Sequence, residues 1–185
     1  MGLLHSRTAV IILLLAYWLS GCYPEIHPSA WQDKTVSMAH FSAFDIQPVT
    51  NSTGKPISQD ILTFLTITLK EKFADNNLHL ADSSGSDGDV LLVQAEILVY
   101  EVKNLEDPSP LNYPFFQPRS IFERFRTAEC VLHTRLINKT TGTVVGEITA
   151  SSKIDVEADA FRPNSVEFLL QELAAAVAKE VTTMK

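Results

Sequence analysis

Two cysteine thiols are the strongest nucleophiles in this sequence, and their surroundings differ. Cys22 follows the small residues Ser20 and Gly21 at the end of a long apolar stretch. Cys130 lies in an alternating apolar and polar pattern that is typical of a strand, on the apolar side. A cysteine in that setting usually packs as a small core side chain. Cys22 is therefore the stronger candidate for covalent chemistry.

Other groups that could do chemistry are scattered along the chain. No pair of histidines has a metal-ligand spacing, and there is neither a G-x-S-x-G motif nor a glycine-rich phosphate loop. The stretch DSSGSDGD departs from a calcium loop, because Asp87 stands where the sharp turn needs glycine, so we interpret it as a solvated loop. We expect no enzymatic activity, no bound metal and no cofactor.

The residues before Cys22 have the layout of a signal peptide. Arg7 supplies a positive charge, and residues 9–19 are apolar and uncharged. This stretch is shorter than the roughly 20 apolar residues that a membrane-spanning helix needs. We predict that residues 1–21 are a signal peptide; the alternative is an uncleaved anchor with an incidental cysteine.

Leu19, Ser20, Gly21 and Cys22 together resemble the lipobox of bacterial lipoproteins. The resemblance implies that Cys22 receives a diacylglyceryl group on its sulfur, that cleavage follows Gly21, and that the new amino group is acylated. Several acyl chains on one residue anchor a protein stably, because each buried CH₂ contributes about 0.8 kcal/mol. Where the next residue directs sorting, aspartate favours the inner membrane. Tyr23 instead favours the outer membrane, with the domain facing the periplasm.

Composition narrows the choice of partners. Residues 1–21 contain one of the 15 Lys and Arg and none of the acidic residues, so their removal changes the net charge from −7 to −8. An acidic chain has no electrostatic preference for nucleic acid or for anionic lipid surfaces. Once Cys22 is acylated, Cys130 has no partner for a disulfide.

Hydrophobic periodicity predicts the elements. Residues 22–36 are polar and aperiodic, and we predict a flexible tether there, followed by a single domain over residues 37–185. Strands are expected at 38–49, 90–102, 126–138 and 144–150, with a short additional strand at 78–81 left open.

Two amphipathic helices complete the pattern. Ser58 is a plausible N-cap for a stripe of Ile61, Leu65, Leu69 and Phe73, and Asn164 opens the second helix with a capping box. The order β-α-β-β-β-α predicts an α+β two-layer sandwich, with both helices packed on one face of a mixed sheet.

The other sheet face should meet water or a partner. Glu129, His133 and Arg135 point to that face, either as a docking patch or as ordinary cross-strand charge pairing. A second candidate partner surface is the proline-rich and aromatic insertion loop at 104–120. Its aromatic residues either bind a partner or the membrane, or fold back to cover the sheet edge or a helix end. They include Tyr113, Phe115 and Phe116.

The lipobox, the strand DVLLVQAEILVYEV and the hairpin LINKTTGTVVGE together resemble small bacterial envelope lipoproteins. These include uncharacterised outer-membrane lipoproteins, ABC-type transport auxiliary lipoproteins, penicillin-binding-protein activators and curli-pore lipoproteins. Asn138 stands where many of them have aspartate. The resemblance implies a membrane-anchored, non-enzymatic accessory protein that docks on another envelope protein. The alternative is a carrier for a lipid or small ligand that works with a transporter.

Overall fold

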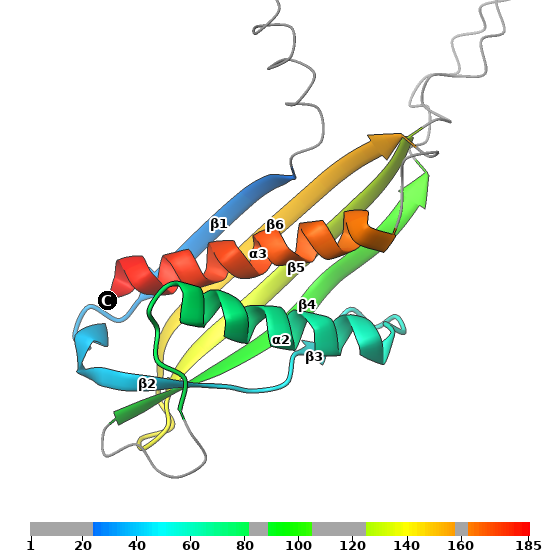
Figure 1. Cartoon of the computed structure of the whole chain (residues 1–185). Helices are drawn as coiled ribbons and strands as arrows, with labels where there is room; N and C mark the ends of the chain where they lie inside the picture. Colours follow the sequence, from blue (N-terminus) through cyan, green and yellow to red (C-terminus); the bar gives the residue numbers. More distant parts are fainter. Residues whose placement is uncertain (1–23, 82–88, 105–124, 158–162) are drawn as a thin grey trace, which may run out of the picture.

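Two helices cover one face of a six-stranded sheet (Figure 1). The computed structural model describes residues 24–81, 89–104, 125–157 and 163–185. This arrangement confirms the predicted α+β class, with both helices on the same side of a mixed sheet. The elements are β1 (Glu25–Gln32), a 3-10 turn (Met38–His40), β2 (Phe41–Ile46), β3 (Thr50–Asn51), α2 (Gln59–Asp75), β4 (Asp89–Asn104), β5 (Phe125–Asn138), β6 (Val144–Glu157) and α3 (Pro163–Met184).

The strand order is β1-β6-β5-β4-β2, and β3 pairs with β4 further along the same edge. β2 and β4 are parallel because α2 crosses over the sheet between them, whereas β4, β5, β6 and β1 pair antiparallel. The apolar sides of the three long strands face the helices, and the core lies between the two layers.

The predicted tether is wrong over most of its length, because residues 25–32 form the edge strand β1. β1 pairs with β6 over its whole length, from Glu25 opposite Lys153 to Gln32 opposite Gly146. Most of its side chains are exposed, so β1 is stabilised mainly by backbone pairing. Backbone pairing requires no regular spacing of apolar residues, and the sequence of β1 shows none. The ladder continues as the Asp33 N–H donates to the Val145 carbonyl at 3.0 Å.

A proline is compatible with this edge. In an antiparallel pair, every second residue exchanges ladder hydrogen bonds with the partner strand. Asp33 makes such a bond to Val145, so the residues at odd numbers in β1 face β6 with their backbone polar groups. Pro28, opposite Ala150, is at an even number and makes no ladder bond. Its nitrogen therefore faces the free edge of the sheet, where the missing N–H removes no ladder bond. Pro28 also makes this edge a poor template for a further strand.

The strand expected at 90–102 is present as β4, but its inward face is interrupted before Val99. The register shifts between Ile97 and Val99, so Leu98 forms a bulge and is exposed. Beyond the bulge, Tyr100 lies opposite the buried Cys130 and takes the position facing the helices. The bulge thus exchanges the inward and outward residues in the last part of β4.

The first predicted strand also contains an irregularity. Residues 38–40 form the 3-10 turn, and the register shifts between Phe41 and Ala43. In a regular strand Phe41 and Ala43 would lie on the face opposite Phe44 and Ile46, yet all four are buried. Residues 78–81 contribute only a single bridge, between Leu80 and Phe44.

Both predicted helices are present. The Ser58 hydroxyl caps α2 by accepting the Asp60 N–H at 3.3 Å, and Leu65, Leu69 and Phe73 are buried as expected. α3 begins at Pro163, so Asn164 lies inside the helix and is not its N-cap. The residues of α3 buried against the sheet and α2 include Leu169, Leu170, Leu173, Val177 and Val181.

The predicted hairpin is confirmed, and its second strand runs further than expected, to Glu157. Ala128, Cys130, Leu132 and Leu136 are buried on the helix side, as the alternation predicted. Val145 is buried and Val144 is only partly buried, because the register shifts between Leu136 and Ile137.

Candidate functional site

The side of the sheet opposite the helices, here called the outer face, is not covered by any described element (Figure 1). Glu129, His133 and Arg135 alternate along β5 and all point to it, as predicted. The structure brings them together with side chains of the neighbouring strands. His133 lies opposite Glu96 and Thr149, and Arg135 lies opposite Gln94 and Glu147.

Hydrogen bonds hold the row of side chains that contains His133. His133 Nδ1 and Thr149 Oγ1 lie 3.1 Å apart, and the Ser52 hydroxyl donates to Glu96 Oε2 at 2.5 Å. Glu96 lies between Ser52 and His133 in this row. These contacts fix the polar side chains on the surface and account for the positions of His133 and Glu96.

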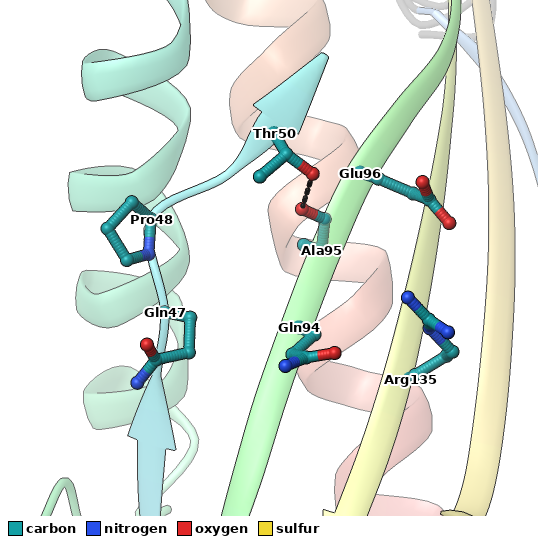
Figure 2. Close-up of a pocket in the computed structure, with 7 residues that line it drawn as sticks. All are labelled: Gln47, Pro48, Thr50, Gln94, Ala95, Glu96 and Arg135. Carbon is teal, nitrogen blue, oxygen red and sulfur yellow. Dashed lines mark hydrogen bonds between the residues drawn. The ribbon is translucent and has the colours of Figure 1, made fainter. Parts of the chain in front are cut away.

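A pocket of about 430 Å³ opens on the outer face beside Arg135 (Figure 2). It forms where the chain leaves β2 and re-pairs as β3: Ile46 lies opposite Val93, and the next pair is Thr50 opposite Glu96. The segment from Ile46 to Thr50 is one residue longer than the segment of β4 that it faces. Pro48, in the longer segment, has no N–H to donate to β4. The lining residues are Gln47, Pro48, Thr50, Gln94, Ala95, Glu96 and Arg135.

The lining of this pocket offers both hydrogen-bond donors and hydrogen-bond acceptors. Gln47 and Gln94 offer amide groups that both donate and accept, Glu96 accepts, and Arg135 donates from a planar guanidinium. The dashed line in Figure 2 marks the bond from the Thr50 hydroxyl to the Ala95 carbonyl, 3.5 Å long. Such a set suits the polar groups of a peptide or an extended surface loop.

Sequence reasoning missed Trp31, which lies on β1 opposite Glu147 and so continues the row that contains Arg135. Trp31 is 54% exposed. It went unnoticed because residues 22–36 were interpreted as a tether. The available signal was a large aromatic residue in an otherwise polar stretch, which a tether does not require.

A second hollow lies on the helix side, between the first turns of α2 and α3 above β4. Its volume is about 400 Å³, and its lining is mainly apolar. Burial raises the pKa of the Tyr100 phenol above its ordinary value, with a smaller contribution from Cys130, so the phenol is neutral. The lining residues are Asp60, Ile61, Phe64, Tyr100, Val166, Glu167 and Leu170, and we call this hollow the helix groove.

Cys130 behaves as the sequence predicted. Its side chain is fully buried, and burial, followed by the nearby Glu129 charge, raises the pKa of the thiol to about 12. The thiol is therefore protonated at neutral pH and is not a nucleophile. In the described parts of the chain, histidine, cysteine, aspartate and glutamate form no group of three placed to hold a metal ion.

Several predicted site residues lie outside the described residues. They are the signal-peptidase motif Leu19, Ser20 and Gly21, the lipidation site Cys22, and the aromatic residues Tyr113, Phe115 and Phe116. The stretch DSSGSDGD lies almost entirely outside them too. Neither α2 nor α3 has the length and apolar character that crossing a membrane requires.

Comparisons with known proteins bear on the fold alone. No protein-family model and no curated protein matches the chain. The hypothetical protein CT253 of Chlamydia trachomatis has a similar structure, with a TM-score of 0.50 and 10% identity over 77% of this chain and 96% of that one.

Two further solved structures show a weaker likeness. A minor lipoprotein of Acinetobacter baumannii has a TM-score of 0.48 and 12% identity, over 77% of this chain and 92% of that one. A DUF4136 family protein of Bacteroides thetaiotaomicron has a TM-score of 0.45 and 14% identity, over 86% of this chain and 98% of that one.

Proposed function

We propose that the chain is a lipid-anchored lipoprotein of the outer membrane, facing the periplasm, and that it acts without enzymatic chemistry. In this proposal it is an accessory protein that binds another envelope protein through its outer face. The observation that carries the proposal is the row from Trp31 through Glu147 and Arg135 to the pocket, on a sheet face that no described element covers. Tryptophan and arginine are the side chains most enriched at the centres of protein interfaces.

Arg135 supports this proposal because its guanidinium forms no ion pair with a described acidic residue. Other cations at the outer face are paired: Lys139 with Asp45 at 2.8 Å and Lys153 with Asp155 at 3.4 Å. Arg135 is exposed and forms no ion pair with any acidic residue that the structure describes, although Glu147 is its cross-strand neighbour. Its guanidinium is free to bind a carboxylate or a run of carbonyl groups on a partner.

A photocrosslinking amino acid at position 133, beside Arg135, tests the proposal in the native host. We expect one reproducible protein adduct, and we expect Arg135→Glu in the same chain to lower its yield about tenfold, as for a central interface residue. The matched control is the crosslinker at Ile67, which is 51% exposed on α2 on the other side of the molecule. Equal trapping from positions 133 and 67, or none from 133 in a folded chain, would contradict docking through the outer face.

The helix groove favours a second candidate function, the binding of a lipid or small ligand. Ile61, Phe64, Val166 and Leu170 offer an apolar surface of the kind that receives an acyl chain. Asp60 and Glu167 are the charged lining residues, so the groove disfavours an anionic headgroup. The ligand class under this proposal is a neutral or cationic amphiphile.

Fluorescent monoacylglycerol provides the probe for the helix groove. If the groove binds an amphiphile, Val166→Trp should fill it and weaken probe binding about tenfold, a loss on the order of 1.4 kcal/mol. The matched control is Ile67→Trp on the exposed side of α2, which should leave binding unchanged. Absence of binding to the native chain, or the same affinity in both variants, would exclude this second function.

A further inference from the structure

We infer that the domain stands end-on at the membrane, with the sheet tip against the lipid surface. The sheet tip is the end at which β4 stops, β5 starts and β6 stops, and it carries Val102, Lys103, Arg126 and Asp155. The inference rests on the proposed lipidation of Cys22 and adds which surface meets the bilayer. It also places the hairpin turn at 138–143 at the end of the sheet that points away from the membrane.

Only a short length of chain separates the anchor from the sheet. Glu25, the first residue of β1, is three residues after Cys22 and pairs with Lys153 of β6. Three extended residues span at most about 11 Å between Cα atoms. Because β1 replaces the expected tether, a lipid on Cys22 holds this part of the sheet close to the bilayer.

From that point the strands run a short way to the sheet tip and a long way to the hairpin turn. β6 continues from Lys153 to its end at Glu157, about 14 Å further, and β4 and β5 extend beside it (Figure 1). In the other direction, β6 runs back from Lys153 to Val144, about 30 Å away. The anchor thus lies much nearer the sheet tip than the hairpin turn.

The sheet tip combines an exposed apolar side chain with paired charges. Val102 is an apolar side chain that is 43% exposed. Lys103 pairs with Glu101 at 3.5 Å and Lys153 with Asp155 at 3.4 Å, so the neighbouring charges are largely compensated. Contact with lipid at this end therefore buries some apolar surface and requires no anionic headgroup.

Depth-dependent fluorescence quenching tests the orientation. The full chain is produced in a bacterium that processes lipoproteins and is reconstituted into vesicles of phosphatidylethanolamine and phosphatidylglycerol with brominated acyl chains. Bimane is attached to Val102→Cys at the sheet tip or, as the matched control, to Thr141→Cys in the exposed hairpin turn. The native thiol at Cys130 is buried and stays unlabelled.

We expect the probe at 102 to lose most of its fluorescence relative to unbrominated vesicles, and the probe at 141 to lose none. Trp31 is the only tryptophan after residue 21 and serves as an internal reference. It lies six residues along β1 from Glu25, about 20 Å, and should also remain unquenched. If Val102→Cys disturbs folding, Lys103→Cys at the same tip carries the same expectation.

Two kinds of result would overturn the inference. Equal quenching at 102 and 141, or none at either site on a lipidated chain bound to the vesicles, would exclude the end-on orientation and leave the lipoprotein proposal intact. An intact mass without the diacylglyceryl and acyl groups would contradict the lipoprotein proposal, and the orientation would fall with it.

Discussion

Replacing Cys22 with serine is expected to abolish lipid attachment completely. A thioether to diacylglycerol requires sulfur, and serine at this position offers only a hydroxyl. Cells grown with labelled palmitate should therefore incorporate label into the native chain and none into Cys22→Ser. We also expect the variant to keep residues 1–21, because cleavage of lipoprotein precursors follows lipid attachment, and to disappear from the outer-membrane fraction.

The second cysteine supplies the matched control for this experiment. Cys130→Ala removes a buried thiol on β5 and should leave palmitate incorporation and membrane fraction unchanged. Label retained by Cys22→Ser, or lost from a folded Cys130→Ala, would show that the lipid is attached elsewhere. Either outcome would remove the basis of the lipoprotein proposal.

Truncation of Phe73 to alanine is expected to give the largest loss of stability among the substitutions considered, about 3–5 kcal/mol of unfolding free energy. Phe73 is fully buried on the inner side of α2. Its ring meets that of Phe44 on β2 edge to face, with centroids 5.6 Å apart and planes at 73°. Alanine would leave a cavity between the helix and the sheet edge and would remove this aromatic pair. Urea denaturation followed by circular dichroism measures the change.

Ile67→Ala on the same helix is the control for this substitution. Ile67 is exposed, so its truncation should change the unfolding free energy by no more than about 0.5 kcal/mol. If Phe73→Ala and Ile67→Ala had the same small effect, α2 would not pack on the sheet through this face. A large loss for Phe73 alone would confirm the predicted stripe as the contact between the two layers.

The end-on orientation and the docking proposal have a joint consequence. With the sheet tip at the bilayer, the outer face stands at the side of the domain, and Trp31 and the pocket beside Arg135 lie on the half away from the membrane. A partner that binds there would project into the periplasm or stand beside the domain, and it would not have to insert into lipid.

The elements that could be predicted from sequence are those whose stability depends on side chains with a regular period. The stripe through Leu65, Leu69 and Phe73 predicted α2, and the alternation through Cys130 and Leu132 predicted β5. The same alternation predicts which side chains of β5 face the helices and which face outward, so His133 and Arg135 were placed correctly on the outer face.

β1 and the pocket could not be predicted in this way. β1 is held by backbone hydrogen bonds to β6. These bonds depend little on side-chain type, so they leave no regular apolar pattern in the sequence. The pocket exists because β2 and β3 pair with β4 in registers that differ by one residue, and this difference is a relation between segments that are far apart in the chain. Trp31 joins the outer face for the same reason, through its pairing opposite Glu147.

The sequence by itself determined the residues proposed for lipidation, both helices with the Ser58 cap, the three long strands and the buried role of Cys130, because each depends on residue type and local spacing. The tertiary structure alone decided that the expected tether is a strand, that the Leu98 bulge turns Tyr100 toward the helices, and that Trp31, Arg135 and the pocket share one surface. Register and strand order decide these features, because they fix which distant residues meet, and no local pattern encodes them.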